Sequence, residues 1–72
     1  MGMKLYVWTP VGHGQLSFMV CAESELLARS AVNARVELVR HDRGFYPVLG
    51  WGTDYYTLGV YEPGEVVEHE ND

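Results

Sequence analysis

The chain has 72 residues, a formal net charge of −5 at pH 7 and a single cysteine, Cys21. This length predicts one domain over residues 1–72, while one cysteine excludes an internal disulfide and argues against structural zinc, which takes four Cys or His ligands. The acidic balance argues against nucleic acid or an anionic membrane as a direct partner, because both attract lysine and arginine.

No targeting or membrane-spanning segment is predicted. No apolar run approaches the roughly 20 residues of a spanning helix, and the N-terminus lacks the basic and apolar stretches of a secretory signal. Met1 and Gly2 before Met3 look like a cloning addition. We therefore expect a cytoplasmic protein in a reducing compartment.

Residues 4–8 and 15–21 are predicted to form the strands of a hairpin. Both segments alternate and are rich in β-branched and aromatic residues, and residues 9–14 between them hold one proline and two glycines. In the first strand, Leu5 and Val7 share one face, and Tyr6 and Trp8 share the other.

A helix is predicted from Glu25, after the N-cap Ser24, to a residue between Val36 and Arg40. One stripe at helical spacing is apolar and is expected to face the sheet; it consists of Leu27, Ala31, Ala34 and Leu38.

The C-terminal part is predicted to hold an apolar loop over residues 41–52 and a strand over residues 55–61. After the turn at Pro63 and Gly64, residues 65–69 could pair back as a fourth strand, and residues 70–72 are expected to fray. The predicted fold is α+β, with a small antiparallel sheet of three to four strands and one helix on one face (ββαβ or ββαββ).

One helix covers only one face of such a sheet, so the second face needs an explanation. The residues expected to meet the helix are Leu5, Val7, Leu16, Phe18, Leu58 and Val60. The residues left on the second face are Tyr6, Trp8, Tyr55 and Tyr61. Either the loop over residues 41–52 covers them, or they form a surface for another protein or for a second copy. An aromatic sheet face can also stack nucleic-acid bases, but the acidic charge disfavours this.

The acidic residues gather at the C-terminal end, while four arginines lie between residues 29 and 43. The acidic residues are Glu62, Glu65, Glu68, Glu70 and Asp72. Such a run commonly serves solubility. The functional alternative is a negative patch that meets a basic groove on a partner protein, including a groove built for nucleic acid, which the patch would mimic.

The residue pattern predicts no catalytic or metal site. His13, His41 and His69 are far apart in sequence, and nothing in their spacing pairs them with Cys21 as a metal site or an activated nucleophile. We expect no enzyme activity and no cofactor.

Three segments carry a resemblance to known proteins: residues 4–8, residues 24–29 and residues 58–64. They resemble small phage and prophage proteins of ββαβ layout, and the size and acidity of the chain are similar to those of anti-CRISPR and other anti-defence proteins. The resemblance implies a non-enzymatic inhibitor in the host cytoplasm. Its target would be a basic, nucleic-acid-handling surface such as that of a CRISPR effector complex.

We expect the protein-binding surface to combine aromatic anchors with acidic side chains. The candidate residues are Trp8, Trp51, Tyr55, Tyr61, Glu62, Glu65, Glu68 and Glu70. The alternative is a homo-oligomer that sequesters a nucleotide-like small molecule between Trp51, Tyr55 and Arg43. A homodimer also stays open, since a domain of this size gains stability from a partner chain.

Overall fold

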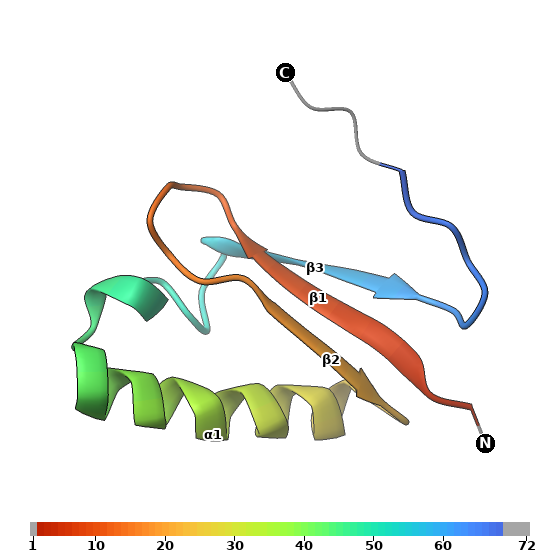
Figure 1. Cartoon of the computed structure of the whole chain (residues 1–72), viewed down its shortest axis with the longest axis horizontal. Coiled ribbons are helices and arrows are strands. Elements are labelled where there is room, and N and C mark those ends of the chain that lie inside the picture. Colours follow the sequence, from red (N-terminus) through yellow and green to blue (C-terminus); the bar gives the residue numbers. More distant parts are fainter. Residues whose placement is uncertain (1, 69–72) are drawn as a thin grey trace.

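The fold is known from a computed structural model, which describes residues 2–68. Two strands, a long helix, a short 3-10 helix and a third strand follow one another along the chain (Figure 1). The elements are β1 (Lys4–Pro10), β2 (Phe18–Ala22), α1 (Glu25–Arg43), η1 (Tyr46–Val48) and β3 (Tyr56–Tyr61). The strands form one antiparallel sheet in the order β2-β1-β3, so the predicted α+β fold with ββαβ layout is confirmed.

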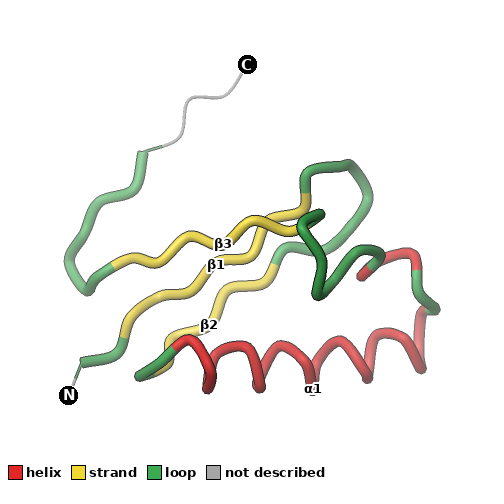
Figure 2. The backbone as a smooth tube through the Cα atoms, turned by 180° about the vertical axis from the view of Figure 1, so that it is seen from behind, coloured by secondary structure: helices red, strands yellow, loops and turns green. Residues whose placement is uncertain are grey.

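The central strand β1 is hydrogen-bonded on both sides and sets the register of the sheet. Trp8 lies opposite Phe18 of β2 and opposite Leu58 of β3, and Tyr6 lies opposite Val20 and Val60. Directly opposed residues of an antiparallel pair project to the same face. These side chains therefore line one face of the sheet, and α1 runs along that face, mainly over β2 (Figure 2).

Strand β1 faces the core with the opposite side from the one expected. Tyr6 is 5% exposed and Trp8 is 2% exposed, whereas Leu5 and Val7 lie on the far face and are only partly covered. The prediction that Leu5 and Val7 meet the helix is wrong, as is the placement of Tyr6 and Trp8 on the second face. Both sides of this strand are apolar, so alternation alone did not decide which side is buried.

Helix α1 begins as predicted and ends later than predicted. The Ser24 hydroxyl accepts a hydrogen bond of 3.2 Å from the Leu27 N–H, which satisfies one of the free donors of the first turn. The helix continues to Arg43 and ends at Gly44, whose φ of 87° suits glycine and whose N–H bonds to the Arg40 carbonyl. No glycine or proline precedes Gly44 in the helix to stop it sooner.

The buried stripe of α1 is not the one expected. Four side chains at positions i, i+4, i+8 and i+11 are buried against the sheet: Ala28, Val32, Val36 and Val39. The predicted stripe points to solvent instead, with Leu27 at 55% and Leu38 at 56% exposure. The helix thus carries two apolar stripes, and the buried one has no side chain longer than valine.

The segment from Gly44 to Gly52 packs on the same side of the sheet as α1. Pro47 and Val48 of η1 are buried, and the Pro47 carbonyl accepts a bond of 2.7 Å from the Leu16 N–H. Trp51 packs edge-on against Trp8 at 5.4 Å between ring centroids. This loop therefore completes the core beside the helix and does not cover the second face of the sheet.

No fourth strand forms over residues 65–68, and His69 lies outside the described residues. The chain turns at Gly64, and the Glu65 N–H bonds to the Glu62 carbonyl at 3.0 Å. The predicted return strand is therefore wrong for residues 65–68. Among residues 2–68, no helix combines the length and the apolar character needed to cross a membrane.

Candidate protein-binding surface

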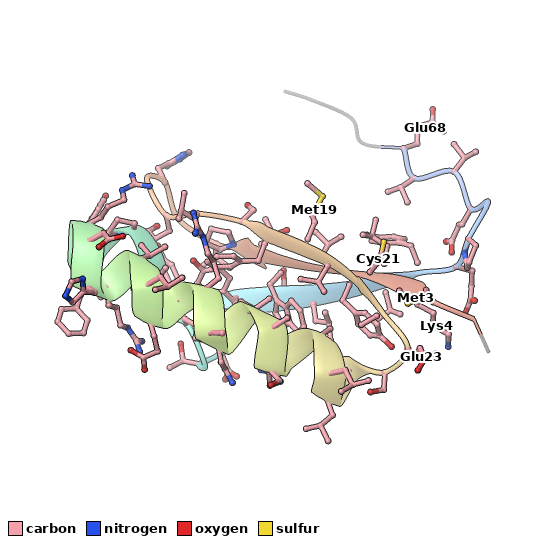
Figure 3. All side chains as sticks on the ribbon, turned by 60° about the horizontal axis from the view of Figure 1, so that its bottom comes forward. Met3, Lys4, Met19, Cys21, Glu23 and Glu68 are labelled. Atoms are coloured by element: carbon pink, nitrogen blue, oxygen red, sulfur yellow. The ribbon has the colours of Figure 1, made fainter. Side chains whose placement is uncertain are left out.

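The sheet face away from α1 is open and largely apolar, and we call it the outer sheet face. It is formed by Leu5, Val7, Met19, Cys21 and Tyr61. Leu5 lies opposite both Cys21 and Tyr61, and Val7 lies opposite Met19. Met19 is 69% exposed, and the Cys21 thiol is exposed beside it (Figure 3). Apolar side chains that gather on one face and stay open to solvent are typical of a binding surface.

Tyr61 is the predicted anchor that the structure places on this face. Its ring lies over Gly59, so that a Cβ on Gly59 would meet the Tyr61 hydroxyl at 2.7 Å. Because Gly59 has no side chain, the Tyr61 ring can lie against the strand at this position. Tyr61 is thereby a half-buried aromatic residue on the outer sheet face.

An acidic segment, residues 62–68, continues directly from this face. The Glu65 carboxylate accepts a bond of 2.9 Å from the Glu62 N–H, which closes the turn at Pro63 and Gly64. Glu62 also forms an exposed ion pair of 3.3 Å with Lys4. Glu68 points into solvent on the same side of the sheet as Met19 and Cys21 (Figure 3). The structure thus places Glu62 and Glu65 in one turn and leaves Glu68 exposed three residues further along; Glu70 lies outside the described residues.

Helix α1 and the rest of the chain differ in the sign of their net charge. Helix α1 carries four arginines and three acidic residues, whereas the other residues of the sequence carry seven acidic side chains and one lysine. Two of the arginines are partly neutralised, Arg29 by Glu25 at 3.1 Å and Arg40 by Glu37 at 3.8 Å. The excess of negative charge therefore lies outside α1 and outside the strands, mainly in residues 62–72.

The other predicted aromatic anchors do not lie on the outer sheet face. Trp8 is part of the buried core, so its placement on an open surface is wrong. Trp51 lies on the helix side, where its Nε1 donates to Asn33 of α1 at 2.7 Å. Tyr55 precedes β3, and its hydroxyl donates to the Gln15 side chain at 2.9 Å. Sequence reasoning instead missed Met19, although the alternation along residues 18–22 is apolar on both sides and signals a second exposed face.

A cavity of about 230 Å³ lies between α1, the loop and β3 on the helix side of the sheet. Its lining residues are Trp8, Arg29, Trp51, Gly52, Thr53, Asp54, Tyr56 and Leu58. Pockets for small-molecule ligands usually measure about 300–1,000 Å³, so this one is undersized for a nucleotide. It contains Trp51 but neither Tyr55 nor Arg43, so it is not the site predicted between Trp51, Tyr55 and Arg43 at an interface between copies, which stays a prediction.

Titratable groups with catalytic chemistry are scattered. Among residues 2–68, no three His, Cys, Asp or Glu side chains gather as a metal-binding group. His41 Nδ1 lies 3.0 Å from a carboxylate oxygen of Asp42, and both side chains are exposed. Burial raises the pKa of Tyr56, and the neighbouring Tyr55 adds to the shift. The Tyr56 hydroxyl donates to the Leu16 carbonyl at 2.7 Å, which is a structural contact.

Comparisons with known proteins give no relative: no family model matches the chain, and neither a curated protein nor a solved structure matches it. The surface of the chain is therefore the basis for a functional proposal.

Proposed function

We propose that this chain is a protein-binding domain without catalytic activity that docks on a basic surface of a partner protein. The observation that supports this most is the continuity of the open apolar outer sheet face with the acidic segment. The apolar side chains would supply buried area, and the carboxylates would match the charge of the partner and speed its approach.

The apolar half of this surface rests on Met19, Cys21 and Tyr61, with Leu5 and Val7 between them. Helix α1 and the loop occupy the opposite face, and on the outer sheet face Met19 and Cys21 are exposed while Leu5, Val7 and Tyr61 are half-buried. Burial of apolar surface contributes roughly 25 cal/mol per Å². A partner that covers the outer sheet face would therefore gain from desolvation of this face as well as from charge.

The acidic segment narrows the class of partner protein to one with a basic surface. Glu62, Glu65 and Glu68 are exposed in the segment that follows β3, and within residues 2–68 the one ion pair that they form joins Glu62 to Lys4. A groove that binds nucleic acid is rich in lysine and arginine. We propose that such a groove is the partner surface, with the acidic segment occupying it in place of phosphates. This is also the mode implied by the resemblance to phage anti-defence proteins, with a CRISPR effector complex as one candidate target.

The test compares two double charge reversals that change the net charge by the same amount. Glu65→Lys with Glu68→Lys removes the acidic segment, and Glu37→Lys with Asp42→Lys is the matched control on α1. Each tagged chain is used to capture partners from a host lysate, and each captured complex is eluted with rising salt. We expect the wild type and the α1 control to retain the same nucleic-acid-handling protein or complex, and the acidic-segment variant to lose it.

Retention of the same partner by the acidic-segment variant, with an unchanged salt dependence, would contradict the proposal. Competition provides the second readout. DNA or RNA added to the captured complex should displace the wild-type chain if the partner surface is a nucleic-acid groove, and a lack of displacement would remove the mimicry part of the proposal.

A further inference from the structure

Strand β3 has one free edge, and its pattern of hydrogen bonds identifies the groups on that edge. The Val11 N–H bonds to the Tyr55 carbonyl at 2.9 Å, and Thr9 lies opposite Thr57. Residues bonded to the neighbouring strand alternate along an antiparallel ladder, so the odd-numbered residues of β3 bond to β1. The N–H and C=O groups of Leu58 and Val60 consequently point away from the sheet.

Both ends of this edge are closed by the chain itself. The Tyr56 N–H bonds to the Thr53 carbonyl at 3.2 Å, and the Glu62 N–H bonds to the Glu65 carboxylate at 2.9 Å. Between these ends, the N–H and C=O groups of Leu58 and Val60 meet no strand among residues 2–68. The open stretch has the length needed to pair with a short extended peptide.

The edge lacks the features that usually prevent pairing with another chain. Natural edge strands are protected by charged residues, prolines, bulges or a covering loop. The β3 sequence Tyr-Thr-Leu-Gly-Val-Tyr contains no charge and no proline, and the strand is six residues long. Val60 is 44% exposed on the helix side, where α1 does not reach it. Such an edge is suited to accept a strand.

The 230 Å³ cavity lies beside this edge. Of the sheet residues in its lining, Trp8 belongs to β1, and Tyr56 and Leu58 belong to β3. A residue paired directly opposite Leu58 in an added antiparallel strand would project to the same face as Leu58, toward the cavity. A cavity of about 150 Å³ can hold benzene, so this one has room for one aromatic or aliphatic side chain.

The charges at the two ends of β3 indicate which kind of chain would pair with its free edge. Asp54 precedes β3 and Glu62 follows it, so carboxylates stand at both ends of the edge. Antiparallel pairing of two copies about Leu58 would bring Asp54 of one copy opposite Glu62 of the other, and like charges directly opposite are destabilising. A segment with basic residues near both ends meets the two carboxylates favourably.

We propose that the free edge of β3 accepts an extended, basic segment of the partner protein as a fourth strand, with one of its apolar side chains in the cavity beside Trp51. This inference rests on the proposed function, because it states how a basic partner would be held. The main-chain bonds to Leu58 and Val60 would supply affinity, and the cavity would supply selectivity.

The test uses a synthetic heptapeptide, acetylated and amidated, of sequence Lys-Thr-Thr-Phe-Thr-Thr-Lys, titrated into the full chain and followed by amide NMR spectra. We expect the Leu58 and Val60 amide signals to shift and to exchange more slowly with solvent. The same peptide with glutamate at both ends, and one with glycine in place of phenylalanine, should each bind more weakly. Because a net strand hydrogen bond is worth about 1 kcal/mol, Val60→Pro should weaken binding by about fivefold or more.

Val60→Thr is the matched control, since it keeps a β-branched side chain and the edge N–H, and it should bind within about twofold of the wild type. Circular dichroism of both variants checks that the sheet is intact. If Val60→Pro does not fold, a peptide N-methylated at the phenylalanine and at the second and sixth residues removes the inward-pointing donors instead, and it should fail to bind.

The possible outcomes separate this inference from the proposed function. Shifts that map to Met19 and Cys21 with β3 unaffected, or no binding by any peptide of the set, would overturn the edge inference and leave the charge-reversal test untouched. Concentration-dependent shifts of Leu58 and Val60 without peptide would make a second copy the occupant, which also overturns it. Binding at β3 by the acidic and basic peptides alike would reject the charge argument in both proposals.

Discussion

Trp51 donates a hydrogen bond from its indole Nε1 to the side-chain oxygen of Asn33 at 2.7 Å, which joins the loop after η1 to the middle of α1. The same indole packs edge-on against the rings of Phe18 at 5.5 Å and Tyr56 at 5.3 Å. Together with its contact to Trp8, this side chain therefore ties the helix, the loop and all three strands together, and it forms a wall of the cavity beside β3.

The Trp51–Asn33 bond should be measurable as a coupling energy. Trp51→Phe and Asn33→Ala each remove one partner, and we expect each to lower the free energy of unfolding, with a coupling of about 1 kcal/mol between them. Urea unfolding of the wild type, both single variants and the double variant gives this value. Additive losses in the double variant would show that the bond contributes nothing to stability.

Gly50 should be less tolerant of a side chain than Gly64, although both have positive φ. Gly50 has φ 86°, and a Cβ there would lie 2.6 Å from the Tyr55 Cβ, whereas Gly64 has φ 83° and open space around it. We expect Gly64→Ala to cost about 1–2 kcal/mol from backbone strain, and Gly50→Ala to cost clearly more because Tyr55 must move. Thermal unfolding of the two variants makes the comparison. Equal losses would mean that Tyr55 adjusts freely.

Stability should fall at high pH because of Tyr56. Burial, with a smaller effect of Tyr55, raises the pKa of Tyr56 above the ordinary tyrosine value of 10.0. The unfolded chain then releases this proton first as the pH rises, so the contribution of Tyr56 is fully present below pH 10 and is lost as the pH rises through the folded-state pKa. Urea unfolding across this range should show a steeper loss for the wild type than for Tyr56→Phe. Parallel curves would contradict the assignment.

Cys21 offers a direct probe of the outer sheet face. Its thiol is exposed and is the only thiol in the sequence, so a bulky maleimide should attach to the folded chain without denaturant. If the outer sheet face binds the partner, the label should abolish capture. The control is a label on Ala31→Cys in a Cys21→Ser background, which places the same group on the exposed side of α1. Capture that survives the Cys21 label would place the partner elsewhere.

The local elements and their order were predictable because the signals for them are local. Ser24 and Glu25 mark the helix start, and the alternation of residues 55–61 marks a strand that the structure places at Tyr56–Tyr61. The helix end and the fate of the acidic segment were less well predicted. Gly44 ends the helix by its backbone geometry. The Glu65 side chain accepts the Glu62 N–H and so closes the turn at Pro63 and Gly64, after which no fourth strand forms over residues 65–68.

The sequence predicted that Tyr61 lies on the second face of the sheet and that the acidic residues form a run, because strand parity and runs of charge can be counted along the chain. It did not indicate where Trp8 and Trp51 lie. Both were expected at an open surface, and the structure packs them against each other on the helix side. The cavity beside β3 depends on residues 8, 29, 51–54, 56 and 58, whose meeting no local pattern encodes.

The sequence by itself determined a small acidic chain with three strands and a helix, because strand alternation, the N-cap and the turn residues act over a few neighbouring positions. Only the tertiary structure decided which sides of β1 and α1 are buried, because each of them has two apolar sides. The buried stripe of α1 has no side chain longer than valine, and it packs with the rings of Tyr6 and Trp8 in one core. That choice leaves Leu5, Val7 and Met19 on the open face of the sheet.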